Sequence, residues 1–205
     1  MNAAARPGAI AAAAALGYVA GLLPSADLAA RAASGGQVDL RVAGTGNPGG
    51  ANAAVVLGRR WGYAVMAGDI AKGFVASRAG RRLAGDVGQH VGAVAAVVGH
   101  CYPVTNGFRG GKGVAASVGQ CLATLPAYVP IDLGVAALTA ASPRWRQRAF
   151  AATVAASVTW VAAATVWWRA DLPNAWGGRP TAGHPLAAAA SSAVIAQRFL
   201  AGSRG

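Results

Sequence analysis

Apolar residues run along almost the whole chain, and only short polar, glycine-rich or proline-containing stretches interrupt them. A hydrocarbon core about 30 Å thick needs about 20 apolar residues per helix, and somewhat fewer where neighbouring helices provide cover. On that criterion the pattern predicts about seven transmembrane helices, near residues 9–33, 53–79, 87–101, 113–127, 128–142, 149–168 and 184–200. No serine- or proline-rich linker separates them. We therefore expect an all-α integral membrane protein that forms a single membrane-embedded domain over residues 1–205.

The composition supports a membrane location. Of the 205 residues, 55% are apolar and only 12% are charged, whereas soluble domains contain about 25% charged residues. A soluble fold of this size would lack the polar residues needed to cover its surface. Alanine and 29 glycines fill the apolar stretches. Such residues permit close helix–helix contact, although an alanine-rich composition alone would give the same pattern.

The net charge of +12 arises from 16 Arg and 2 Lys against 6 Asp, with no Glu. We interpret the arginines as positive-inside topology signals rather than as a nucleic-acid-binding surface. An odd number of spans with a cytoplasmic C-terminus places eleven basic residues inside, namely Arg31, Arg41, Arg59, Arg60, Arg109, Lys112, Arg144, Arg146, Arg148, Arg198 and Arg204. Six remain outside, namely Arg6, Arg78, Arg81, Arg82, Arg169 and Arg179. This asymmetry predicts an external N-terminus and two cytoplasmic glycine-rich loops, residues 41–52 and 99–113.

The first glycine-rich loop, residues 41–52, reads RVAGTGNPGGAN. Its glycines allow several backbone N–H groups to point toward one position, and Asn52 can cap the helix expected from Ala53, so an anion can lie at that helix N-terminus. A flexible connecting turn is the alternative. The Gly-x-Gly-x-x-Gly spacing also fits a dinucleotide fingerprint, but that motif requires a βαβ unit, and no alternating strand–helix pattern follows it.

The second glycine-rich loop, residues 99–113, reads GHCYPVTNGFRGGKG and is followed by an apolar helical segment. Arg109, Lys112, the glycine N–H groups and a helix start come together here, and this combination is suited to phosphate. It is not a Walker A loop, because Asn106 occupies the position of the first glycine. The chain uses lysine only at Lys72 and Lys112. This choice indicates positions that require a compact ammonium group, unless it is chance in an arginine-rich composition.

Asp69 and Lys72 are ionisable residues within the second predicted helix. At a spacing of three they share a helix face and can neutralise each other, and ionisable groups inside a span usually face a working site. A purely structural ion pair is the alternative. His100 lies beside the second loop and can accept a proton or donate to phosphate. Neither Cys101 nor Cys121 belongs to a C-x-x-C pair, so we expect small core residues and no metal site.

Four segments carry a family resemblance: GYVAGLLPSADLAARAASGGQVDLR, GTGNPGGAN, GDIAKGF and, the most specific, GHCYPVTNGFRGGKGVAAS. In this order they resemble the bacterial membrane glycerol-3-phosphate acyltransferases of the PlsY type, which use acyl-phosphate donors. The resemblance implies a seven-span enzyme of the bacterial cytoplasmic (inner) membrane. It implies acyl transfer from acyl phosphate to the 1-hydroxyl of glycerol 3-phosphate, which gives lysophosphatidic acid for phospholipid synthesis. It implies no cofactor, and partners limited to the two substrates and membrane lipid.

The resemblance also implies roles for individual residues. The catalytic candidates, His100, Asp69 and Lys72, come from the residues themselves, and the phosphate-binding candidates come from the resemblance. The candidates for binding one phosphate are Arg41, Thr45, Asn47 and Asn52, and those for the other are Arg109, Gly110, Gly111, Lys112 and Gly113. An acyl phosphate is already activated, so the reaction needs no protein nucleophile, only cations for the phosphates and a base for the glycerol hydroxyl. That base is His100, Asp69 or an oxygen of the substrate phosphate.

Three features depart from the family pattern. Thr45 stands where the family usually has Ser, and Val55 occupies a position where an Arg is expected. In the last helix, Ser192 and Ile195 stand where the family has a His and an Asn, and Ser203 replaces the closing Glu.

Two other interpretations stay open, and the departures favour only the first of them. One is a catalytically inactive homologue, unless Arg59 or Arg60 supplies the missing cation. The other is a membrane transporter or channel for a phosphorylated solute, which the same cationic loops would serve. Internal repeats, which are typical of transporters, are not evident in the two halves of the chain.

Overall fold

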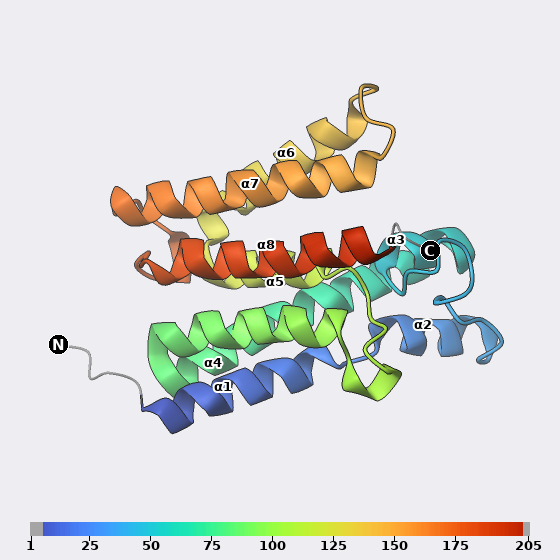
Figure 1. Cartoon of the computed structure of the whole chain (residues 1–205), viewed down its shortest axis with the longest axis horizontal. Helices are drawn as coiled ribbons and strands as arrows, with labels where there is room; N and C mark the ends of the chain where they lie inside the picture. The colour runs from blue at the N-terminus through green and yellow to red at the C-terminus, as the bar shows by residue number, and fades with distance from the viewer. Residues whose placement is uncertain (1–5, 203–205) are drawn as a thin grey trace.

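The computed structural model describes residues 6–202, and all regular structure in this range is helical. The helices run roughly along one common direction, so the molecule has two ends (Figure 1). The α-helices are α1 (Pro7–Gly21), α2 (Ser25–Ser34), α3 (Gly50–Val56), α4 (Arg59–Cys101), α5 (Val114–Thr124), α6 (Val129–Ala141), α7 (Arg148–Arg169) and α8 (Gly183–Gly202). Short 3-10 turns lie at Val104–Asn106, Pro126–Tyr128 and Ala175–Gly177.

The first two predicted spans are each interrupted in the structure. The segment predicted as one helix over residues 9–33 breaks between α1 and α2, because Pro24 cannot donate a backbone hydrogen bond and its ring disfavours helix at the preceding residue. The segment predicted over residues 53–79 is divided into α3 and the first half of α4. The break lies at Gly58, whose φ of +99° lies in the left-handed region.

Helix α4 folds back on itself as a hairpin. Ala84 and Gly85 have non-helical backbone angles, and the φ of +60° at Gly85 favours glycine. The two halves then pack together, and the hydroxyl of Ser77 donates to the carbonyl of Gln89 at 3.4 Å. This reversal coincides with the gap predicted between residues 79 and 87.

The length and hydropathy of the helices indicate which of them are long and apolar enough to cross a membrane on their own. Within the described residues, two stretches are long and apolar enough, Pro7–Ser34 and α7, and a third qualifies if α5 and α6, bent by 117°, form one broken span. The 11 residues of α5 extend only about 16 Å, well short of a hydrocarbon core. Such short helices depend on their neighbours for cover.

Glycine brings the helices around α4 into close contact. A Cβ atom at Gly17 of α1 would lie 2.2 Å from the carbonyl oxygen of Gly92, and one at Gly119 of α5 would lie 2.0 Å from that of Ile70. Both distances are far below van der Waals contact, so a larger residue would push the helices apart. The close contact between small residues that the composition permits is therefore present in the fold.

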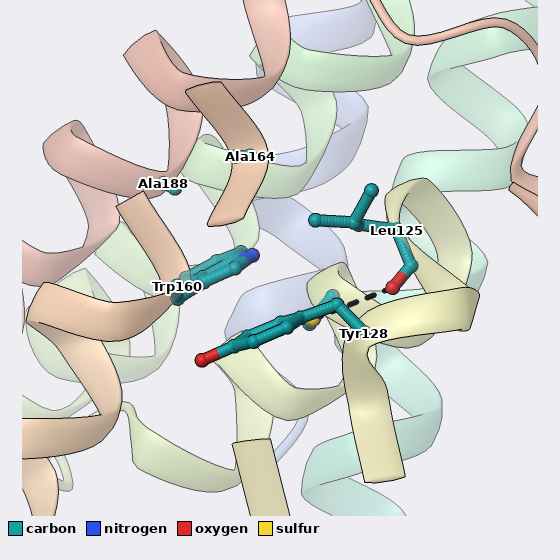
Figure 2. Close-up of a cluster of buried hydrophobic side chains, with 6 residues drawn as sticks. Leu125, Tyr128, Trp160, Ala164 and Ala188 are labelled. Atoms are coloured by element: carbon teal, nitrogen blue, oxygen red, sulfur yellow. Dashed lines mark hydrogen bonds between the residues drawn. The ribbon is translucent and has the colours of Figure 1, made fainter. Parts of the chain in front are cut away.

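A buried apolar cluster joins the α5–α6 bend to α7 and α8 (Figure 2). The hydroxyl of Tyr128 within it donates to Thr159 of α7 at 2.7 Å, which satisfies the polar end of a buried ring. Both cysteines are free and buried, as predicted for small core residues. The members of the cluster are Cys121, Leu125, Tyr128, Trp160, Ala164 and Ala188.

Candidate active site

A small pocket lies where the break between α1 and α2 meets both halves of α4 and the second glycine-rich loop. Asp69, Lys72 and His100 are the buried ionisable residues that line it. Arg41 and Asn106, which are less buried, line it as well. The pocket therefore combines an enclosed charged group with a more exposed polar edge.

The predicted Asp69–Lys72 pair is present, and the fold adds His100 to it. The Lys72 ammonium lies 2.9 Å from Oδ1 of Asp69, and the two side chains are only 4% and 3% exposed. Nδ1 of His100, from the other half of the α4 hairpin, lies 3.5 Å from the same oxygen. Lys72 also donates to the carbonyl of Leu23 at 3.1 Å, beside the break that Pro24 causes. The two halves of α4 therefore meet at one carboxylate, and the break between α1 and α2 contacts its lysine partner.

The orientation of His100 suits a proton acceptor. With Nδ1 facing Asp69, the other ring nitrogen, Nε2, lies next to Gly111, where a Cβ would be only 2.3 Å away. Glycine at this position leaves room for the imidazole, and both residues line the pocket. A carboxylate that holds one ring nitrogen while the other faces a reacting group is a common arrangement for a general base.

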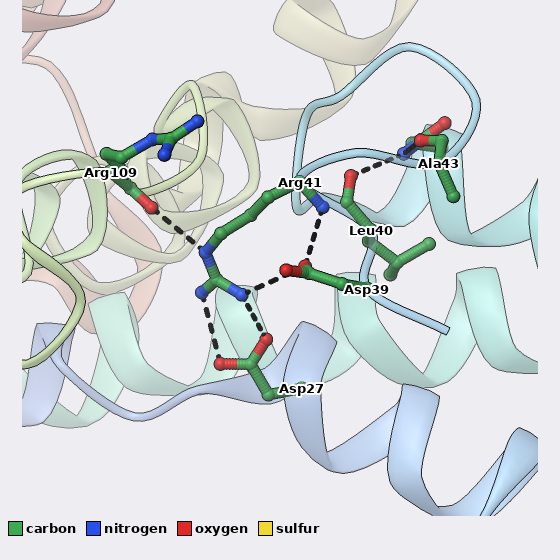
Figure 3. A network of polar contacts seen from close by, with 7 residues as sticks. Asp27, Asp39, Leu40, Arg41, Ala43 and Arg109 are labelled. Atoms are coloured by element: carbon green, nitrogen blue, oxygen red, sulfur yellow. Dashed lines mark hydrogen bonds and ion pairs between the residues drawn. The ribbon is translucent and has the colours of Figure 1, made fainter. Parts of the chain in front are cut away.

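Arg41 connects the two glycine-rich loops (Figure 3). Its Nη1 and Nη2 contact the two carboxylate oxygens of Asp27 at 2.5 and 3.1 Å, Nη1 lies 3.5 Å from Asp39, and Nε donates to the carbonyl of Arg109 at 3.2 Å. When the Asn106 amide is oriented so that its nitrogen donates to the carbonyl of Thr105, its oxygen accepts from Nη2 of Arg41 at 2.6 Å. The hydrogen bonds to Asp27 raise the pKa of Arg41. These contacts occupy its N–H groups, so direct phosphate binding by Arg41 remains a prediction that requires exchange of a partner.

Asn52 holds the first loop rather than capping a helix, which corrects the sequence-based expectation. Helix α3 begins at Gly50, so Asn52 lies inside it and is 2% exposed. Its amide nitrogen donates to two loop carbonyl groups at 3.0 and 2.9 Å, and its oxygen accepts from the N–H of Thr45 at 2.8 Å. A Cβ at Gly44, whose φ is +61°, would lie 2.2 Å from that oxygen, so this position requires glycine.

The other candidates from this region do not line the pocket. Thr45 is exposed and Asn47 is half-buried. Arg59 is exposed, and Arg60 lies over the ring of Trp61 at 5.2 Å. In this conformation neither arginine supplies the cation that the family places near Val55. Phosphate binding by Thr45 and Asn47 stays a prediction.

The N–H groups of Gly110 and Gly111 are engaged at the end of α4, so phosphate binding by these N–H groups stays a prediction that requires exchange of a partner. They donate to the carbonyl groups of Cys101 and His100, each at 3.2 Å. The last carbonyls of a helix lack partners within it, and these glycines supply them. The sequence could not show this, because the contact depends on the chain turning back after Phe108.

Lys112 and Gly113 lead into α5. The Lys112 ammonium lies over the ring of Phe199 in α8, 4.2 Å from its centre. Burial and then the charge of Arg198 lower the pKa of Lys112. Gly113, with φ of +85°, precedes the first residue of α5. The exposed Arg109 contacts Arg41 through its carbonyl group, so its side chain remains available to a ligand.

Three residues near the site escaped the sequence analysis: Asp27, Asn106 and Arg198. Asp27 carried a detectable signal, because it is an ionisable residue inside a predicted span. Arg198 was assigned only to topology, yet it contacts the second loop across 87 residues of sequence. Its role becomes visible only in the packed structure.

The positions that depart from the family pattern in α8 are buried away from this pocket. Ile195 is 2% exposed and packs with Val97 and Cys101. The hydroxyl of Ser192 is buried, with no hydrogen-bond partner among the described residues. Ser203 lies outside the described residues. Within that same part of the chain, no three His, Cys, Asp or Glu residues are arranged to hold a metal ion.

The fold and the pocket define a helical membrane protein with a charged site between basic, glycine-rich loops. More specifically, the chain belongs to the glycerol-3-phosphate acyltransferase family, whose model matches residues 11–199. It is 44% identical over 111 residues to the glycerol-3-phosphate acyltransferase of Exiguobacterium sibiricum, covering 54% of this chain and 53% of that protein. It is 40% identical over 164 residues to that of Gloeobacter violaceus, covering 76% of each. The match spans about half to three fifths of the length of the first relatives, including this Exiguobacterium sibiricum protein.

Solved structures agree with the fold. A crystal structure of PlsY, an integral membrane glycerol 3-phosphate acyltransferase in its glycerol 3-phosphate form, matches with a TM-score of 0.72 at 28% identity, covering 94% of this chain and 90% of that one. The lysophosphatidic acid form matches with a TM-score of 0.73 at 24% identity, with 95% and 90% coverage. The predicted all-α, multi-pass bacterial membrane protein is therefore confirmed.

Proposed function

We propose that this protein transfers an acyl group from acyl phosphate to the 1-hydroxyl of glycerol 3-phosphate and releases lysophosphatidic acid and inorganic phosphate. The whole chain, residues 1–205, would form one acyltransferase domain in the bacterial cytoplasmic membrane. The observation that carries the proposal is the His100–Asp69–Lys72 group, buried in a pocket that the second basic loop borders. The names of the relatives and of the solved structure support acyl transfer to glycerol 3-phosphate.

The arrangement divides the work of this reaction between residues of the pocket and two basic residues of the second glycine-rich loop that lie outside its lining. The glycerol C1 oxygen attacks the acyl carbonyl carbon and forms the new ester bond, and its proton passes to Nε2 of His100. Asp69 orients the imidazole and stabilises its positive charge, while Lys72 forms an ion pair with Asp69. The bond between the acyl carbon and the phosphate oxygen breaks, and the leaving phosphate is stabilised by Arg109 and Lys112.

The test is direct incubation of the detergent-purified protein with palmitoyl phosphate and radiolabelled glycerol 3-phosphate. We expect radiolabelled lysophosphatidic acid from the wild type, and a rate lower by about 10²- to 10⁴-fold in His100→Gln. Binding of glycerol 3-phosphate without product would establish an inactive homologue. Uptake of glycerol 3-phosphate into proteoliposomes without acyl transfer would establish a transporter instead.

A further inference from the structure

We infer that Arg198 is a positioning residue, which holds the second glycine-rich loop in the shape that lets Lys112 and the start of α5 bind phosphate. This inference rests on the proposed function, because it concerns the phosphate substrates of the same site. It concerns a side chain that does not itself line the pocket.

Arg198 binds the loop through its backbone. Its Nη2 donates to the carbonyl of Gly110 at 2.7 Å, and its Nε donates to that of Gly111 at 3.3 Å. The N–H groups of the same two glycines donate to the end of α4. The backbone of both glycines is therefore held on two sides, by α4 and by α8.

The two glycines explain why an outside cation is needed. They have no side chains with which to pack, and a Cβ at Gly110 would lie 2.0 Å from the carbonyl oxygen of His100. Arg198 supplies the missing contact with two donors of one planar fork, a geometry that lysine cannot reproduce. It also binds two carbonyl oxygens whose partial negative charge opposes an anion nearby.

The next residue of α8 holds the functional side chain of the loop. Phe199 carries the Lys112 ammonium on its ring at 4.2 Å and contacts the ring of Phe150 at a centroid distance of 5.5 Å. A cation–π contact of this kind is weak enough for a phosphate to displace. Arg198 thus holds the backbone of the second glycine-rich loop, while Phe199 holds the Lys112 side chain of the same loop.

The end of α8 is itself well anchored. Ile195, three residues before Arg198 and thus on the same helix face, is buried against Val97. The Arg198 guanidinium also lies over the ring of Tyr102 at 5.3 Å, and Tyr18 donates to the Tyr102 carbonyl at 2.9 Å. Packed elements on each side therefore define where the guanidinium lies.

The first test compares Arg198→Met and Arg198→Lys with Arg146→Met, which removes an exposed arginine of the α6–α7 connection. Titration calorimetry with glycerol 3-phosphate should show a roughly tenfold or greater rise in Kd for Arg198→Met, a smaller rise for Arg198→Lys and none for the control. Hydrogen exchange at residues 107–113 should accelerate in Arg198→Met. Unchanged Kd and exchange, or complete recovery by Arg198→Lys, would overturn the inference.

A double-mutant cycle separates positioning from direct contact. If Arg198 acts through Lys112, adding Arg198→Met to Lys112→Met should change Kd by less than about threefold. If the double variant raises Kd by the product of the two single effects, Arg198 binds the phosphate itself, and the inferred positioning role is wrong. If the wild type lacks acyltransferase activity, the proposed function fails, but phosphate affinity and hydrogen exchange still decide the role of Arg198.

Discussion

The Lys112 ammonium lies on an aromatic ring, and no carboxylate of the described residues is within ion-pair distance of it. A cation in this state is free to bind a substrate phosphate, and a hydrogen bond to a charged group contributes about 1.5–3 kcal/mol. Lys112→Met should therefore weaken substrate binding roughly tenfold to a hundredfold and leave the fold intact. Lys112→Arg should also be impaired, because a guanidinium is longer and planar.

Titration calorimetry with glycerol 3-phosphate and with an acyl phosphate measures this effect and shows which substrate Lys112 holds. Thermal unfolding in detergent verifies that the variant is folded. If the folded Met variant keeps wild-type affinity for both substrates, Lys112 does not belong to the site.

The lowered pKa of Lys112 predicts a dependence of binding on pH. Burial and the charge of Arg198 make the ammonium lose its proton at a lower pH than a free lysine does. The charged form exists below that pKa, so affinity for glycerol 3-phosphate should fall as the pH rises through it. The Kd measured across alkaline pH should show this decline in the wild type but not in Lys112→Met. An identical decline in both proteins would assign it to another group.

Replacing one partner of the buried Asp69–Lys72 pair should destabilise the protein more than replacing both partners. Taking away one partner leaves an uncompensated charge, which costs about 3–5 kcal/mol in buried pairs, whereas replacing both is often nearly neutral. Asp69→Asn and Lys72→Met should each lower the unfolding temperature in detergent more than the double variant does. Asp171→Asn, which breaks an exposed pair with Arg179, should have little effect. Wild-type stability of both single variants would contradict the prediction.

At the scale of single residues, the sequence revealed contacts within one helix and missed contacts between elements. Asp69 and Lys72 were paired correctly because a spacing of three fixes their common helix face. The approach of His100 to Asp69 depends on the hairpin in α4, and that of Arg198 to Gly110 depends on where α8 packs. No local pattern encodes such distances.

At the scale of elements, glycine is required where helices touch but not elsewhere. A Cβ at Gly119 of α5 would lie 2.0 Å from the carbonyl of Ile70, whereas one at Gly134 of α6 would have no neighbour within 4 Å. Gly119→Ala should destabilise the protein by about 1–3 kcal/mol. Gly134→Ala should be neutral or stabilise it by up to about 1 kcal/mol through helix propensity. Thermal unfolding of the two variants in detergent checks this, and equal effects would exclude close packing at Gly119.

The helices themselves were predictable because apolar runs separate them from polar turns. The breaks within the first two predicted spans were less predictable, although Pro24 and Gly58 are recognisable helix breakers. Hydropathy averages over such residues and joined α1 to α2 and α3 to the first half of α4. The bend between α5 and α6, which contains Pro126, depends on packing against α7 as well.

For the molecule as a whole, the basic residues divide between its two ends. The glycine-rich loops lie together at one end, because Arg41 and Arg109 contact each other, and the C-terminal end of α8 lies there too (Figure 1). The connection between α7 and α8 lies at the opposite end, beside the turn of the α4 hairpin, where Arg81 donates to the carbonyl of Gly177. The packing therefore brings together residues that the sequence analysis placed on one side of the membrane.

The orientation of these two ends is our last prediction. The positive-inside rule places the end with more basic residues, and with it both glycine-rich loops, in the cytoplasm. Cysteine substitutions at the exposed Thr45 and Thr105 should then resist a membrane-impermeant thiol reagent applied to intact cells, whereas Ala175→Cys at the opposite end should react. The native Cys101 and Cys121 are 0% and 1% exposed and should contribute little background. All three positions should react after the cells are opened. Labelling of Thr45→Cys or Thr105→Cys from outside, with Ala175→Cys protected, would reverse the topology.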